Sequence, residues 1–254
     1  MSIKSNISNK LQSVAYTTPG TYSWICPAGV YTVIVEGVGG GGGGGGTGNA
    51  TINGATNRGA SGGAAAIRTI MALDVSPGTS YSVVVGAGGA GAPYGCYANG
   101  PTTHGSPGGT SYFGGVPISK GGNGGISVRV SETDIRGGQS VLEPTFPASS
   151  LDGESFIVIA PGSGGHGYPN GGANNGGISE NGFYGPTIGA NTSRGGGGGG
   201  SSFYGVGGAP GTDGQSGFSA PSTSYGAGGG GAGGNPVATY YGGSGAGGYL
   251  KITY

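Results

Sequence analysis

Glycine recurs on every third position in several parts of the chain. The clearest runs carry it at Gly205, Gly208, Gly211, Gly214 and Gly217, at Gly228, Gly231 and Gly234, and at Gly242, Gly245 and Gly248. A period of three is the repeat of a polyproline II helix, which makes no internal hydrogen bonds and leaves its backbone groups free. Two such helices can approach closely only where the residue at their contact has no Cβ atom. The pattern therefore predicts short glycine-rich helices that bond to one another and carry other side chains outward.

The composition separates an ordered glycine-rich protein from a disordered one. Glycine (70 residues) and proline (15) are a large share of the 254 residues, which is typical of low-complexity chains. The 15 tyrosines and six phenylalanines argue against a solvated, disordered chain. Nine basic and nine acidic residues give no net charge, which argues against a nucleic-acid partner. No stretch has the apolar length of a membrane span, and the N-terminus lacks the pattern of a secretory signal.

Strand patterns concentrate towards the two ends of the chain. The expected strands are Thr21–Ile25, Val30–Val38, Ile126–Val130, Ser155–Ala160 and Tyr249–Tyr254. The last one is expected to pair with an early strand and so to tie the two ends together. Residues 1–13 are polar and predict an arm or attachment segment, and residues 14–254 predict one glycine-rich domain. The predicted fold is all-β with negligible α-helix: a β-sandwich or β-layer near the termini, combined with a bundle of polyproline II-like helices.

The segment Ala64–Val75 is ambiguous between a short helix and a strand. Pro77 and Gly78 follow it as turn residues, and a second β-branched run comes directly after them. A Pro-Gly turn between two such runs is typical of a β-hairpin. The sequence therefore predicts two strands that pair with each other across this turn.

Several blocks of the chain follow one pattern: Trp24 followed by Pro27-Ala28-Gly29, a Val-rich run, the polyglycine run Gly39–Gly46 and the block Leu73–Gly91. The closing sequence GGSGAGGYLKITY matches the same pattern. Over about residues 15–254 the chain therefore resembles a glycine-rich domain that recurs in bacteriophage tail-fibre and tail-tip proteins. The chain is also similar in style to the distal adhesins of T-even-like phages. That resemblance implies a glycine scaffold whose far-end loops contact the bacterial surface.

No residue pattern predicts catalysis, a metal site or a cofactor. His104 and His166 are the candidate general bases, and neither has an acid and a nucleophile in a recognisable spacing. Gly59–Gly63 matches the G-x-S-x-G nucleophile motif, but no helix is expected after it, as that motif requires. Cys26 and Cys96 either stay as two thiols or form one bridge. We therefore expect a protein that is not an enzyme.

Three irregular loops interrupt the glycine period and gather aromatic and amide side chains. Rigid tyrosines with neighbouring amides suit both sugar and protein surfaces, and function tends to sit on loops that a rigid scaffold holds. The candidate receptor-binding residues are Tyr94, Tyr97, Asn99 and His104 in the first loop, Tyr168 and Asn170 in the second, and Tyr240 and Tyr241 in the third. The alternative is that these rings cover the glycine bundle as its hydrophobic coat.

These observations predict a receptor-binding or tail-fibre protein of a bacteriophage. We expect it to recognise a bacterial surface polysaccharide or an outer-membrane protein without catalysis, and to reside in the virion tail after synthesis in the host cytoplasm. Other tail or fibre proteins are expected to contact its N-terminal segment, with no nucleic acid bound and no membrane insertion. The alternative is a structural or ice-binding glycine-rich protein.

Overall fold

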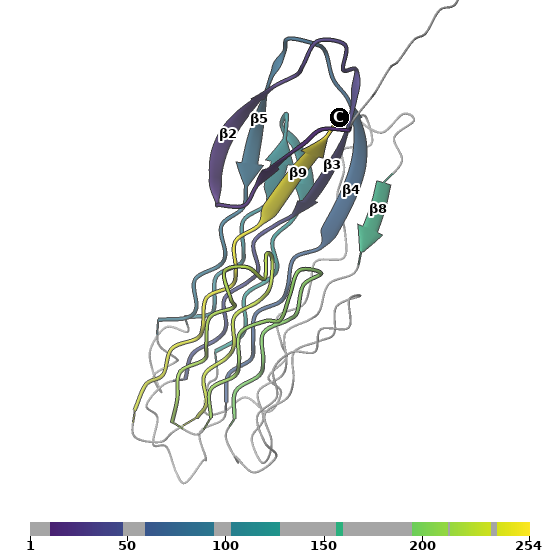
Figure 1. Cartoon of the computed structure of the whole chain (residues 1–254). Helices are drawn as coiled ribbons and strands as arrows, with labels where there is room; N and C mark the ends of the chain where they lie inside the picture. Colours follow the sequence, from purple (N-terminus) through teal and green to yellow (C-terminus); the bar gives the residue numbers. More distant parts are fainter. Residues whose placement is uncertain are drawn as a thin grey trace, which may run out of the picture.

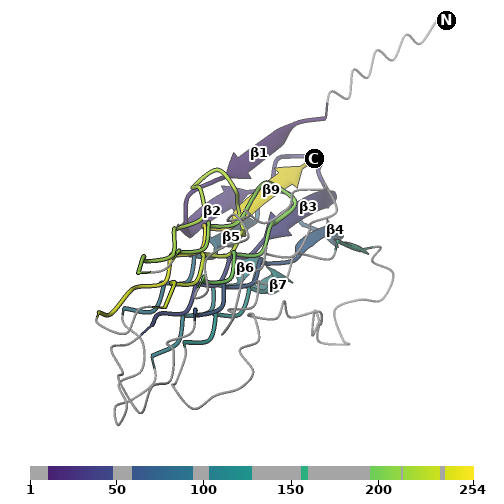
Figure 2. The same cartoon turned by 90° about the horizontal axis from the view of Figure 1, so that it is seen from below.

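Nine β-strands and a set of glycine-rich segments make up the part of the chain that the structure describes. The computed structural model describes residues 11–47, 59–93, 103–127, 195–212, 214–234 and 238–254, and the backbone of residues 156–159. Figure 1 shows the strands at one end of the molecule and the glycine-rich segments running side by side away from them. Figure 2 shows the same arrangement from below.

The strands form two antiparallel sheets. The five-stranded sheet has the order β1 (Ser13–Tyr16), β9 (Tyr249–Thr253), β3 (Thr32–Val38), β4 (Arg68–Asp74) and β8 (Phe156–Ile159). The four-stranded sheet has the order β2 (Gly20–Ile25), β5 (Ser80–Val85), β6 (Ser111–Phe113) and β7 (Val116–Ser119). The described residues contain no helix, so the prediction of an all-β protein is confirmed for this part of the chain.

The hydrophobic core contains side chains from both sheets. Trp24 of β2 lies within ring-contact distance of Phe113 of β6, with centroids 5.8 Å apart, and Met71 and Ile252 are fully buried in the same cluster. On β3, Val33 and Val35 are buried while Ile34 between them is 47% exposed. This alternation has the period of two that a half-buried strand requires. The sequence pattern thus fixes which face of β3 turns inward.

The C-terminal strand joins the two ends of the chain. β9 lies between β1 and β3 and pairs with both, so that Leu250 is opposite Tyr16 and Ile252 is opposite Val35. The prediction that the terminal strand lies beside a strand from the first forty residues is confirmed. The predicted strand at Ser155–Ala160 is also present, as β8 on the edge of the same sheet.

The predicted hairpin around Pro77-Gly78 is wrong. Both strands exist, but β4 pairs with β3 and β5 pairs with β2, so the turn carries the chain from one sheet to the other. The turn from β2 to β3 makes the same crossing, and the two turns bond to each other: Cys26 N–H donates to Thr79 O and Gly78 N–H donates to Cys26 O. Because of this crossing, β4 and β5 lie in different sheets and contribute to one core from opposite sides. In a hairpin they would lie side by side in the same sheet.

The predicted strand at Ile126–Val130 needs adjustment. Ile126 and Ser127 belong to a glycine-rich segment and not to a strand, and the rest of the predicted strand Ile126–Val130 lies outside the described residues. The hairpin of β6 and β7 has no counterpart among the predicted strands. Gly114 and Gly115 make its turn with φ angles of 57° and 87°, a backbone conformation that favours glycine. Residues 1–10 of the predicted arm lie outside the described residues.

The glycine-rich segments bond to one another through their backbones, and together they are called the glycine bundle here. It comprises residues 39–47, 59–67, 86–92, 103–109, 120–127, 195–202, 205–212, 214–220, 226–234 and 240–248. The inner segment 39–47 donates to its neighbours in turn. Gly40 and Gly43 N–H groups donate to residues 109 and 106, at 2.8 and 2.9 Å, while Gly41 and Gly44 donate to residues 246 and 243. The hydrogen bonds therefore repeat every three residues.

The carbonyl groups of the same inner segment complete the pattern. Gly41 O accepts from Gly89 N–H and Gly42 O accepts from Gly229 N–H. The segments that donate to these carbonyl groups differ from the segments that accept from the amides of residues 39–47, so the inner segment is bonded on several sides. A Cβ atom on Gly41 would overlap the carbonyl group of Ala227, and one on Gly42 would overlap that of Asn123. Close approach of backbones on all sides therefore requires glycine along this segment.

Serine side chains complete the hydrogen bonding where the bundle meets the two sheets and their shared core, which are together called the sandwich here. Ser119 Oγ accepts from Gly39 N–H at 2.8 Å and donates to Ile67 O. Ser111 Oγ accepts from Gly86 N–H at 3.1 Å and donates to Val38 O at 2.9 Å. Both serines are buried. Each hydroxyl therefore bonds to one backbone N–H and one backbone C=O group at the place where a strand ends and a glycine-rich segment begins.

Candidate functional site

The end of the glycine bundle far from the sandwich is called the distal end here. β3 runs into segment 39–47, which therefore reaches the distal end at Thr47. Thr47 forms a two-way backbone bridge with Tyr240: its N–H donates to Tyr240 O at 2.9 Å and Tyr240 N–H donates back at 3.0 Å. The Thr47 hydroxyl donates to Gly233 O at 3.0 Å and is buried. This bridge fixes the backbone of Tyr240 to the bundle.

A second network fixes His104 at the same end. Ser127 Oγ accepts from Gly46 N–H at 2.8 Å and donates to Thr103 O, and Ser127 N–H donates to His104 Nδ1 at 3.1 Å. His104 is exposed. Its Nδ1 is therefore committed to the backbone while the rest of its ring faces solvent, a suitable arrangement for contact with another molecule.

The two neighbouring tyrosines differ in exposure. Tyr241 is 53% exposed, and its backbone N–H donates to Ser216 Oγ at 3.1 Å, whereas Tyr240 is half-buried. The same division holds for Tyr112 and Phe113 of β6, which are 37% and 2% exposed. In such pairs one ring packs on the body and the other remains available.

The structure thus brings three of the predicted site residues, His104, Tyr240 and Tyr241, to the distal end around Gly46 and Thr47. The remaining predicted residues, Tyr94, Tyr97, Asn99, Tyr168 and Asn170, lie outside the described residues. Pro93 and Thr103, which lie within the first predicted loop on either side of residues 94–102, are both described. They follow and precede bundle segments at this same end, because Ala92 N–H donates to Gly44 O and Ser127 donates to Thr103.

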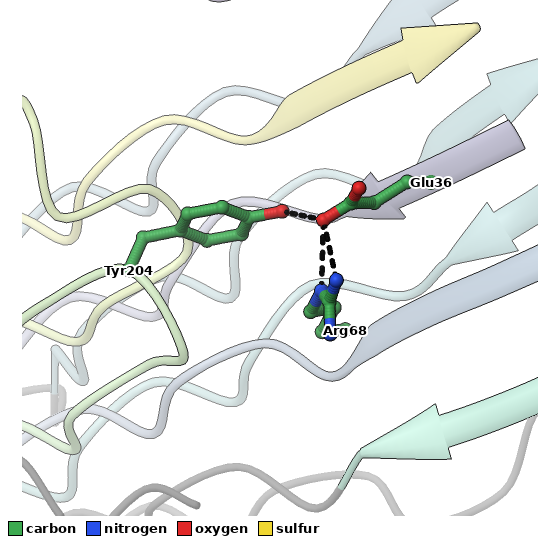
Figure 3. A network of polar contacts seen from close by, with 3 residues as sticks. All are labelled: Glu36, Arg68 and Tyr204. Atoms are coloured by element: carbon green, nitrogen blue, oxygen red, sulfur yellow. Dashed lines mark hydrogen bonds and ion pairs between the residues drawn. The ribbon is translucent and has the colours of Figure 1, made fainter. Parts of the chain in front are cut away.

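A polar network that the sequence analysis missed lies where the bundle meets the outer face of the five-stranded sheet. Figure 3 shows Arg68 of β4 and the Tyr204 hydroxyl converging on one carboxylate oxygen of Glu36. The guanidinium donates through Nε and Nη2, each 2.8 Å from that oxygen, and Tyr204 donates at 2.6 Å. Arg68 and Glu36 are 14% and 20% exposed, so water screens this ion pair only partly.

Aromatic rings surround this network. The Arg68 guanidinium lies 3.9 Å from the ring centroid of Phe203, within the range of a cation–π contact. The Tyr204 ring is 5.1 Å from Tyr249, which stacks on Tyr225 at 5.4 Å. Burial, and after it the hydrogen bond to Glu36, raises the pKa of the Tyr204 phenol and keeps it protonated. The network joins the 202–205 turn of the bundle to β3 and β4.

Family comparison agrees with the glycine pattern. A family described as "Glycine-rich domain" matches residues 17–254. The chain belongs to this family. Comparison of this glycine-rich domain with curated proteins gave no match.

Within its described residues no helix is long and apolar enough to cross a membrane, and no cluster of potential metal ligands occurs. Cys26 is a buried free thiol in the structure, and Cys96 lies outside the described residues.

The missed network had a weak sequence signal. Glu36 and Arg68 are charged residues inside two mainly apolar runs, on strands that pair with each other. In the register of this glycine-rich domain, Glu36 is opposite Ile70 and Arg68 is opposite Val38, so the two charges are diagonal neighbours. Only the pairing of β3 with β4 brings the two charges together, whereas the predicted hairpin pairs β4 with β5.

Proposed function

We propose that this glycine-rich domain is a non-catalytic receptor-binding or tail-fibre protein of a bacteriophage. Its target would be a polysaccharide or an outer-membrane protein of the bacterial surface, and its distal end would contact that target. The observation that carries the proposal is the gathering of His104, Tyr240 and Tyr241 at one end of the bundle, away from the sandwich. The resemblance of the strand and polyglycine blocks to phage tail domains supplies the phage context.

The proposal includes the conformation of the glycine segments. We infer that they are polyglycine II-like helices packed side by side, because their hydrogen bonds repeat every three residues and run between segments. Such a bundle is a stiff rod made without a wide hydrophobic core. It would hold the loops at a constant distance from the sandwich, as a tip protein requires.

The exposed side chains at the distal end are suited to contacts that need no ionic attraction. Tyr241 offers a ring with little conformational entropy to lose, and His104 offers the unbonded side of an imidazole. Stacking and hydrogen bonding of this kind fit a chain with no net charge. In this proposal the protein resides in the virion tail, is made in the host cytoplasm, binds no nucleic acid and inserts into no membrane. Its N-terminal segment would face other tail or fibre proteins.

Binding of fluorescently labelled protein to a panel of bacterial strains tests the proposal. Tyr241→Ala should weaken binding to a recognised strain about tenfold or more, the loss typical of an exposed anchor residue, with an unchanged melting temperature. Tyr112→Ala is the matched control, because it removes another exposed tyrosine from the sandwich and should leave binding unchanged.

Two results would count against the proposal. If Tyr241→Ala lowers stability and leaves the binding of folded protein intact, the ring is part of the coat of the bundle. If no strain of a broad panel binds the wild-type protein and the protein inhibits ice recrystallisation, the ice-binding alternative is favoured.

A further inference from the structure

An open groove of about 460 Å³ lies at the end of the sandwich opposite the glycine bundle. Its walls are the two residues before β1, the turn between β2 and β3, the first residue of β3, and Tyr254 after β9. This volume falls in the range of about 300–1,000 Å³ that is usual for binding sites of small ligands. The groove is separate from the distal end, because β3 runs the length of the sheet between them (Figure 1).

The side chains of the groove are uncharged and of mixed polarity. Tyr31, 67% exposed, and Tyr254 contribute aromatic rings. Gln12 contributes an exposed amide, and Thr32 a hydroxyl that donates to Asp74 at 3.2 Å and can still accept a hydrogen bond. This combination offers ring faces for C–H groups and polar atoms for hydroxyl groups, and none of the lining side chains is charged.

The groove is also held in place before any ligand binds. Tyr254 packs against Trp24 with ring centroids 5.5 Å apart, and its backbone exchanges two hydrogen bonds with Gln12, at 2.8 and 2.9 Å. The β2–β3 turn is braced by the neighbouring turn, since Val75 N–H donates to Tyr31 O at 2.8 Å. A preformed site loses little entropy on binding.

The turn adds backbone groups to the groove. Among the described residues, the N–H groups of Ala28 and Gly29 have no protein acceptor, and both residues are exposed. Two consecutive free N–H groups beside an amide and a hydroxyl can satisfy several oxygens of one ligand.

We propose that this groove binds a neutral saccharide. A sugar ring would stack on Tyr31, while its hydroxyl groups would bond to Gln12, to Thr32 and to the turn amides of Ala28 and Gly29. A neutral sugar fits better than a phosphate or a carboxylate, because the groove has no lysine, arginine or histidine side chain. The inference is independent of the function proposed for the distal end.

The chain provides its own reporter for this test, because Trp24 is the single tryptophan and contacts Tyr254. The probes are glucose, galactose, mannose, rhamnose and N-acetylglucosamine, with glucuronic acid as a charged comparison, each titrated into the full-length chain. At least one neutral sugar should change the Trp24 emission saturably and shift the backbone amide resonances of Ala28 and Gly29. Glucuronic acid should bind more weakly than the neutral sugar.

Variants then locate the site. Tyr31→Ala and Gln12→Ala should each weaken sugar binding about tenfold, which corresponds to about 1.4 kcal/mol, and both residues are exposed, so melting temperatures should hold. Tyr112→Ala removes an exposed tyrosine that does not line the groove, so it should bind the sugar like wild type. The proposal is overturned if no neutral sugar gives a saturable response, or if both variants bind with wild-type affinity. It is also overturned if sedimentation shows that Tyr31 holds two copies of the chain together in this groove.

Discussion

The change Gly41→Ala probes the inner segment of the glycine bundle with a single methyl group. The new Cβ atom would overlap the carbonyl group of Ala227, and it would also approach Gly226 O at 2.8 Å. Both contacts are to backbone, which cannot rotate away as a side chain would. Segments 39–47 and 226–234 must therefore separate locally if the methyl group is to be accommodated.

The cost follows from the hydrogen bonds that join these two segments. Gly229 N–H donates to Gly42 O at 2.9 Å, and Ala232 N–H donates to Gly45 O at 3.0 Å. Each pair left unsatisfied in the buried bundle costs about 1–3 kcal/mol, so the loss is about 2–6 kcal/mol. The lower entropy of the unfolded alanine chain offsets about 0.4–1 kcal/mol of this. The net destabilisation is therefore about 1–6 kcal/mol.

Urea unfolding monitored by Trp24 fluorescence and by circular dichroism measures this difference. Ala90→Ser is the matched control, because it adds one heavy atom to an exposed position of a bundle segment, and it should change the free energy of unfolding by less than about 0.5 kcal/mol. If Gly41→Ala is as well tolerated as Ala90→Ser, close backbone packing around the inner segment is refuted.

Other substitutions test other contacts. Gly211→Val, whose Cβ would overlap Gln215 O, should lower the melting temperature, whereas Thr212→Val should change it little, and equal effects would contradict the close backbone contact at Gly211. Ser119→Ala leaves the Gly39 amide and a carbonyl unpaired and should cost about 1–3 kcal/mol per group in urea unfolding; no loss would mean that water replaces the hydroxyl. Tyr204→Phe removes a bond to a carboxylate and should cost about 1–2 kcal/mol near neutral pH. Because the folded pKa of Tyr204 is raised, its contribution is complete below the unfolded value of about 10 and is lost as pH rises above it, so the difference between wild type and Tyr204→Phe should shrink in alkaline solution; a constant difference would contradict this.

Local patterns predicted β2, β3, β4, β5, β8 and β9 but not β1, β6 or β7, and they identified few of the strand partners. The alternation around Val33 and Val35 identified β3 and its inward face, and the position of Leu250 and Ile252 identified β9. The turn at Pro77-Gly78 was found, but turn residues do not determine whether the chain returns within one sheet or crosses to another. That choice depends on which strand has a free edge, which is a property of the whole fold.

The candidate site shows the same division. The aromatic pair Tyr240-Tyr241 can be recognised in the sequence because it interrupts the glycine period. The structure shows that Tyr240 is half-buried and Tyr241 is exposed. The bridge between Thr47 and Tyr240 joins residues far apart in the sequence, and nothing in a glycine triplet specifies which other triplet lies beside it. The serines that close the hydrogen bonds of the bundle are ordinary residues in the sequence, and only the pairing of segments gives them their role.

Hydrogen exchange of individual backbone amides tests the central claim most directly, which is that the glycine segments form a hydrogen-bonded bundle able to hold the distal end in place. Each amide from Gly40 to Gly45 donates to a neighbouring segment, so these amides should exchange slowly, at the rate of global unfolding. The amides of Ala28 and Gly29, which have no protein acceptor in the described part of the chain, should exchange quickly and serve as the internal reference. If the amides of Gly40–Gly45 exchange as fast as that reference, the glycine segments are not bonded to one another and the account is wrong.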